Sequence, residues 1–85
     1  MTLLYFAWVR EKIGLAEEVI TLPAEIRTVD ALLGWLAARG PGYAAALARR
    51  EAVRVAVNQA HASAQAPVTN TDEVALFPPV TGGAR

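Results

Sequence analysis

The C-terminal residues of the chain are the ones whose types and spacing favour a specific chemistry. Gly82-Gly83 comes shortly after Pro78-Pro79, and adjacent prolines favour an extended polyproline II segment. An extended stem that ends in two residues without side chains can enter a narrow channel and deliver its carbonyl to another protein's active site. A terminal carboxylate is inert there until ATP converts it into an acyl adenylate. The tail therefore predicts a carrier of an activated acyl group, and the alternative is an ordinary frayed terminus.

The other polar residues do not form the pattern of a catalytic site. His61 is flanked by alanines rather than by a Ser or Cys nucleophile. Glu17-Glu18 and Asp72-Glu73 are adjacent pairs, and adjacent residues of a strand point to opposite faces, so neither pair predicts a carboxylate dyad. The chain contains no Cys and a single His, which excludes disulfides, thiolate metal sites and multi-histidine metal sites. We therefore expect no metal site and no catalysis by this chain alone.

Length and composition predict one small domain. The chain has 85 residues and a formal net charge of zero. A balanced charge lacks the basic surface of a protein that binds duplex nucleic acid. The sequence has no run of about 18 or more apolar residues, so no membrane-spanning helix is expected. The first residues are apolar without a basic segment before them, which is unlike a signal peptide, and we expect a cytoplasmic protein with no nucleic-acid or membrane partner.

The secondary structure expected to position these residues consists of one amphipathic helix, a second short helix and several strands. Apolar residues from Val29 to Leu36 recur at helical spacing, Thr28 suits the N-cap, and Gly40 followed by Pro41 suits a left-handed cap and stop. A second, Ala-rich helix is expected at residues 43–50. Strands are expected at residues 2–9, 17–22, 53–57 and 73–77, the first two as a hairpin with a loose loop, and a weak edge strand is expected within residues 60–67. The fold class is therefore α+β, a mixed sheet of four to five strands with one main helix packed on one face.

The first and last strands predict an apolar open face on this sheet. If Leu3, Tyr5 and Ala7 face the helix, then the alternate residues face outward with Phe77 of the last strand. These outward residues would be Leu4, Phe6 and Trp8. An aromatic patch on a small domain marks a surface for a partner protein. The alternative is that the two faces are assigned the wrong way round and these aromatics form the core.

Three segments together resemble a known protein family. They are residues 4–11 (Leu-Tyr-Phe-Ala-Trp-Val-Arg-Glu), residues 57–59 (Val-Asn-Gln) and residues 72–83, which end in Phe-Pro-Pro-Val-Thr-Gly-Gly. The chain is similar over nearly its whole length to the small, sulfur-carrying subunit of molybdopterin synthase. The resemblance implies the ubiquitin-like β-grasp fold, with a domain at residues 1–79 and a flexible C-terminal tail at residues 80–85.

The resemblance also implies a function. In this family an E1-like enzyme uses ATP to adenylate the terminal Gly, and a sulfur donor converts the adenylate into a thiocarboxylate. The carrier then inserts its tail into the large synthase subunit, in a heterotetramer, and sulfur passes to cyclic pyranopterin monophosphate during molybdopterin synthesis. By this resemblance Gly83 would carry the sulfur and Gly82 would give clearance. No cofactor would be bound by this chain, since ATP is used by the activating enzyme.

The same resemblance predicts which residues contact the partner. Phe6 and Phe77 would belong to the docking face, and Arg10 is similar to a family arginine near that contact. His61 stands where relatives carry an apolar interface residue. The stem that follows the face would contribute Pro78, Pro79, Val80 and Thr81.

The chain departs from the family pattern after the glycine pair. Relatives end at the second Gly, whereas this chain continues with Ala84-Arg85, and Gly83 has no free carboxylate while they are attached. We expect a peptidase to remove them; the alternatives are an artefact of expression or a copy that is not a working carrier. Two other functions remain open: a sulfur carrier for thiamine or tRNA thiolation, and a β-grasp interaction module that carries no sulfur.

Overall fold

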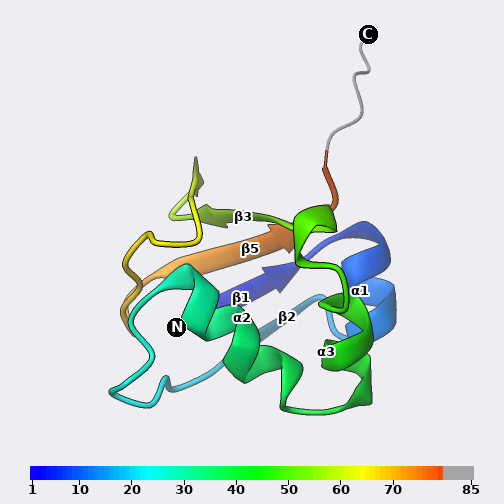
Figure 1. The fold of residues 1–85 in the computed structure, drawn as a ribbon, viewed down its shortest axis with the longest axis horizontal. Coiled ribbons are helices and arrows are strands. Elements are labelled where there is room, and N and C mark those ends of the chain that lie inside the picture. Colours follow the sequence, from blue (N-terminus) through cyan, green and yellow to red (C-terminus); the bar gives the residue numbers. More distant parts are fainter. Residues whose placement is uncertain (80–85) are drawn as a thin grey trace, which may run out of the picture.

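The computed structural model describes residues 1–79, which form a five-stranded mixed sheet with helices on one side (Figure 1). The strand order is β2-β1-β5-β3-β4, in which β1 and β5 run parallel and the other pairs are antiparallel. The expected α+β architecture with a mixed sheet is confirmed. In chain order the elements are β1 (Thr2–Tyr5), α1 (Ala7–Ile13), β2 (Glu17–Val19), α2 (Val29–Ala37), α3 (Pro41–Ala46), the 3-10 turn η1 (Arg50–Ala52), β3 (Arg54–Val57), β4 (Ala60–His61) and β5 (Glu73–Phe77).

The main helix, α2, begins as the sequence predicts. The Thr28 hydroxyl oxygen accepts a hydrogen bond of 3.2 Å from the backbone N–H of Ala31, which satisfies one of the free donors of the first turn. The expected apolar face is buried, and it joins the core residues of β1 and β5 in one cluster. That face consists of Val29, Leu32, Leu33 and Leu36.

The first strand is shorter than expected, and the prediction of a strand to Val9 is wrong. β1 ends at Tyr5, and α1 begins at Ala7, whose φ of 53° turns the chain sharply out of the sheet. Val9 is buried on this helix and Ala7 is exposed. Helix and strand both carry apolar residues here, so composition alone does not separate them. The expected hairpin of the first two strands exists, with α1 in its connection.

Three helix boundaries and one strand boundary also differ from the prediction. α2 ends in the right-handed conformation at Ala38, and Gly40 has a φ of 166°, which is extended backbone. Pro41 is therefore the first residue of α3. A backbone N–H at this position would have no acceptor within the helix, so its absence in proline costs nothing. α3 ends at Ala46 rather than Arg50, and β2 ends at Val19 rather than Leu22.

The turn between β3 and β4 is confirmed at Asn58-Gln59, where both residues have positive φ. The Asn58 amide donates to Asp72 (2.9 Å), and its oxygen accepts the backbone N–H of Glu73 (2.9 Å). The hydrogen bond from Asn58 and a second one from the backbone N–H of Thr69 lower the pKa of Asp72. This junction ties the β3–β4 turn to the start of β5 and so fixes the register of the strand that leads to the C-terminal stem.

Candidate partner-docking face

The strand register decides which residues share the open face of the sheet. Leu3 and Tyr5 are 0% and 1% exposed and face the helices, so the expected face assignment of β1 is confirmed and the reversed one is wrong. Leu4 lies opposite Ala75, which lies opposite Ala56. Directly paired residues project to the same side of a sheet. These side chains and His61, which pairs with Ala56, therefore form one row across four strands.

Aromatic residues form the next row toward the C-terminal ends of β1 and β5. Phe77 is half-buried, and the His61 ring meets it edge-on with 5.8 Å between centroids and 65° between planes. Phe6 is 47% exposed directly after β1, and its backbone N–H donates to the carbonyl of Leu76 (3.1 Å). The structure thus brings together Phe6, Phe77 and His61, three of the residues expected to contact a partner.

Trp8 does not belong to this row, so its expected place on the open face is wrong. It lies on α1, packs partly against the core, and lines a shallow pocket with residues of α3 and η1. The turn at Ala7 explains the difference, because period-two alternation ends where the strand ends.

Charged residues border the aromatic row. Arg54 lies opposite Phe77 on β3. Arg10 is exposed on α1, one turn after Phe6, where its backbone N–H donates to the Phe6 carbonyl (3.4 Å). Arg54 was not singled out from the sequence, although the alternation Val-Arg-Val-Ala-Val of residues 53–57 places it outward. The docking face is defined here as Leu4, Phe6, Arg54, Ala56, His61, Ala75 and Phe77.

Pro78 and Pro79, the described residues of the C-terminal stem, leave the sheet beside the aromatic row. Pro78 and Pro79 are half-buried and follow β5, a strand paired on both sides by β1 and β3. The expected contributions of Val80, Thr81, Gly82 and Gly83, and the extension Ala84-Arg85, lie outside the described residues. β1 and β5 run parallel and end at the same end of the sheet (Figure 1), so the aromatic row and Pro78-Pro79 lie at that end.

A polar cluster on the helix side of the sheet was missed by the sequence reading. The hydroxyls of Tyr5 and Tyr43 each donate to Oε2 of Glu18 (2.7 Å each), and Arg39 contacts Oε1 at 3.2 Å. The Arg39 guanidinium also lies over the rings of Trp35 and Tyr43. Burial alone would raise the pKa of Glu18, but hydrogen bonds from the two tyrosines and the charge of Arg39 outweigh it and lower that pKa. Burial, and then the hydrogen bond to Glu18, raises the pKa of both Tyr5 and Tyr43.

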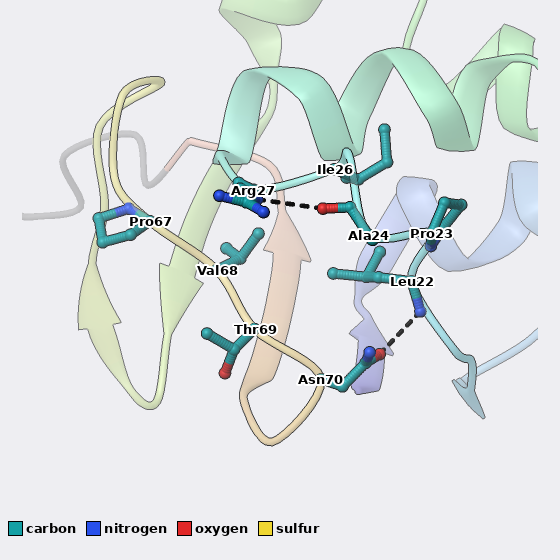
Figure 2. A pocket seen from close by; sticks show the side chains of 9 residues that line it. All are labelled: Leu22, Pro23, Ala24, Ile26, Arg27, Pro67, Val68, Thr69 and Asn70. Carbon is teal, nitrogen blue, oxygen red and sulfur yellow. Dashed lines mark hydrogen bonds between the residues drawn. The ribbon is translucent and has the colours of Figure 1, made fainter.

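A pocket of about 420 Å³ lies apart from the docking face, between the loop before α2 and the loop before β5 (Figure 2). Two of its polar side chains make hydrogen bonds within the chain. Arg27 donates to the carbonyl of Ala24 (3.1 Å), and the Asn70 side chain accepts the backbone N–H of Leu22 (2.7 Å). None of the expected site residues lines this pocket, so we assign it to the packing of the two loops.

Residues 1–79 contain no cluster of three or more side chains suited to hold a metal ion. Over the same range, no helix has the length and hydropathy to cross a bilayer.

Known proteins resemble this chain in sequence and in fold. The ThiS family matches residues 3–83. Two curated relatives carry the name molybdopterin synthase sulfur carrier subunit. The one from Escherichia coli is 44% identical, with 94% of this chain and 95% of the relative covered; the one from Haemophilus influenzae is 40% identical, with 98% and 99% covered. Among solved structures, SAMP1 from Haloferax volcanii superposes with a TM-score of 0.72 at 28% identity, with 98% of each chain covered. These neighbours confirm the ubiquitin-like β-grasp fold.

Proposed function

The chain belongs to the ThiS family, and from this we propose that it is a sulfur carrier of molybdenum cofactor biosynthesis whose Gly83 carboxylate carries the sulfur. The observation that carries the proposal is the likeness to two sulfur carrier subunits of molybdopterin synthase over nearly the full length of each. The Phe-Pro-Pro-Val-Thr-Gly-Gly ending supports the same function. Its first residue, Phe77, is the last residue of β5 and belongs to the docking face, and Pro78 and Pro79 follow directly.

The chemistry is group transfer at a carboxylate. One oxygen of the Gly83 carboxylate attacks the α-phosphate of ATP on an E1-like enzyme, and pyrophosphate leaves. The terminal sulfur of a persulfide on a donor protein then attacks the acyl carbon, and AMP leaves with one carboxylate oxygen. A thiol cleaves the resulting acyl disulfide, so that the sulfur stays on the acyl carbon as a thiocarboxylate and the thiol forms a disulfide with the donor. The thiocarboxylate sulfur finally attacks a carbon of cyclic pyranopterin monophosphate on the large subunit and displaces an oxygen substituent there. Water then hydrolyses the resulting thioester, which leaves the sulfur on the pterin and regenerates the carboxylate.

Glycine suits this position because the acyl carbon must be reached by three different proteins. A Cβ next to the reacting carbonyl would narrow the approach of each nucleophile and would require a wider channel in the large subunit. Gly82 extends the bare backbone by one residue. The folded body, residues 1–79, contributes binding rather than reaction steps.

Ala84-Arg85 must be removed before this chemistry can begin, because an internal Gly83 has no carboxylate. The test compares the full chain with a variant that ends at Gly83, each incubated with the E1-like enzyme, ATP and a sulfur donor. Intact-mass measurement should detect adenylate and then thiocarboxylate only on the shorter chain. Sulfur-dependent modification of the full chain at any other position would contradict the proposal.

The protein that the chain binds, and the product that receives the sulfur, show which biosynthetic pathway the carrier serves. Capture of a molybdopterin synthase large subunit by the Gly83-ended chain, with formation of molybdopterin from the cyclic precursor, is the expected result. Sulfur transfer to a thiamine precursor or to tRNA instead would support a carrier for those products. Partner binding without any modification of the tail would support the interaction module. The 44% and 40% identities to synthase subunits favour the first outcome.

A further inference from the structure

The charged residues of the open sheet face are sorted along the strand direction. Glu73, at the start of β5, lies opposite Thr2, and Arg54 lies opposite Phe77 at the end of β5. Glu73 and Phe77 are four residues apart on one strand, so both side chains project to the open face, roughly 13 Å from each other at about 3.3 Å per residue. The face therefore has an acidic end and a basic end, with the stem leaving from the basic one.

Two further charges border the face, a basic one beyond the aromatic row and an acidic one at the β2 edge. Glu17 on the edge strand β2 pairs with Leu4 and so projects to the open face. Arg10 is exposed on α1 beyond Phe6. The acidic residues thus lie toward β2 and the start of β5, and the basic residues lie toward the aromatic row and the stem. The apolar row of Leu4, Ala56 and Ala75 lies between Glu73 and the basic residues, and Glu17 stands at the β2 end of that row.

These four charges are free of ion pairs within residues 1–79. The ion pairs there join other residues: Glu18 with Arg39, Glu51 with Arg49, and Asp30 with Arg50. Asn58 engages the backbone N–H and the backbone carbonyl of Glu73, and the Glu73 carboxylate makes no hydrogen bond within residues 1–79. Because the formal net charge of the chain is zero, the sorted charges make a dipole across the face rather than a general excess of one sign.

We propose that this dipole orients the large synthase subunit on the docking face. The partner's matching surface has an apolar centre, carboxylates around the entrance that receives the tail, and cationic side chains at the opposite end. Electrostatic complementarity of this kind raises the association rate and penalises a reversed orientation more than it adds affinity. A reversed partner would place its carboxylates against Glu73 and its tail channel away from Pro78 and Pro79. The inference rests on the proposed function, since it concerns the partner of the same face.

The test is a titration of the Gly83-ended chain with the recombinant large subunit from the same organism, with association rates measured by stopped flow. We expect Arg54→Glu and Glu73→Lys each to weaken binding about tenfold, mostly through slower association, with the loss shrinking at high salt. Arg27→Glu and Glu25→Lys are the matched controls, because both residues are exposed in the loop before α2 and outside the face. Their affinities should stay within about twofold of the unchanged chain. Arg54→Gln separates loss of the positive charge from gain of a negative one, and thermal unfolding of each variant shows that the fold is intact.

The outcomes separate this inference from the proposed function. If the unchanged chain binds the large subunit, and Phe77→Ala weakens binding while both charge reversals bind normally, the face docks without electrostatic orientation and the inference is wrong. If Arg27→Glu and Arg54→Glu weaken binding equally, total charge rather than the sorted face is responsible, which also overturns it. If the unchanged chain does not bind the large subunit at all, the proposed function itself fails, and this inference fails with it.

Discussion

The hydroxyl of Tyr43 on α3 and the carboxylate of Glu18 on β2 are joined by a hydrogen bond of 2.7 Å. The same Oε2 atom accepts the hydroxyl of Tyr5, which is 1% exposed in the core. One carboxylate therefore connects the edge of the sheet, its interior and the helix layer. Without the Glu18 carboxylate, the buried hydroxyl of Tyr5 would lose its hydrogen-bond acceptor and would still pay the free-energy cost of being removed from water. Glu18 therefore stabilises the fold by accepting the hydrogen bonds of the two tyrosines.

Replacing Glu18 by Gln should destabilise the protein by about 1–2 kcal/mol at pH 7, because hydrogen bonds to a charged acceptor are stronger than those to a neutral amide. The pKa of Glu18 is lowered in the folded state, so its stabilising contribution is present above the unfolded pKa of about 4.3. It is lost as the pH falls through the lower folded value. Urea unfolding at a series of pH values should show the difference between Glu18→Gln and the unchanged chain shrinking below about pH 4. Glu17→Gln is the control, since this neighbour is exposed and makes no side-chain hydrogen bond within residues 1–79; an equal loss in both variants would contradict the prediction.

Replacing Ala7 by Gly should leave the stability unchanged or raise it by up to about 1 kcal/mol. Ala7 has a φ of 53°, a left-handed conformation that costs an L-residue roughly 1–2 kcal/mol and costs Gly little. Denaturant unfolding measures the effect. Ala45→Gly, at an exposed position inside α3, is the matched control and should lose about 0.5–1 kcal/mol. If Ala7→Gly loses as much as Ala45→Gly, the backbone at Ala7 is not left-handed.

Replacing Gly42 by Ala should destabilise the protein by about 1–3 kcal/mol. A Cβ at this position would lie 2.6 Å from the backbone carbonyl oxygen of Lys12, so α1 and α3 would have to move apart. Gly34→Ala offers the contrast, because its Cβ would meet only the end of the Arg50 side chain at 3.3 Å. Inside α2 that change should gain up to about 1 kcal/mol of helix propensity. Melting temperatures that move in the same direction for both variants would disprove the close approach of the two helices.

Replacing Phe77 by Ala should weaken binding of the large subunit roughly thirtyfold, since truncating a central aromatic anchor commonly costs about 2 kcal/mol. Its neighbour Leu76 is fully buried on the helix side of the same strand. Leu76→Ala should instead cost about 2–5 kcal/mol of stability. Calorimetric titration of both variants measures the change in affinity, and thermal unfolding measures the change in stability. A Phe77→Ala variant that binds normally would remove Phe77 from the interface.

Much of this fold could be predicted from residue patterns. The cap at Thr28, the buried stripe of α2 and the strand at residues 73–77 follow from local rules that depend on neighbours in sequence. The end of the first strand does not, because residues 2–9 are apolar at both strand and helix spacing, and only the tertiary structure stabilises the unfavourable backbone at Ala7. That one turn decides that Trp8 packs on a helix while Phe6 remains on the open face.

The candidate site could be predicted only where its residues follow from local sequence patterns. Phe6 and Phe77 follow from alternation along single strands. The closeness of His61 to Phe77, and of Arg54 to both, depends on the pairing of β3 with β4 and β5, which joins residues distant in sequence. The cluster around Glu18 is a more extreme case, because its members come from four separate segments and no local spacing connects them.

The parallel pairing of Thr2–Tyr5 with residues 73–76 has a consequence for biosynthesis. The strand made first and the strand made near the end of the chain lie side by side in the middle of the sheet, so a nascent chain cannot complete its core while residues 73–77 are still inside the ribosome. Folding of such distant pairs is slow compared with local contacts. A stalled or truncated product that lacks this strand also lacks the glycine pair, so every chain synthesised as far as the glycine pair also contains the strand that completes the core.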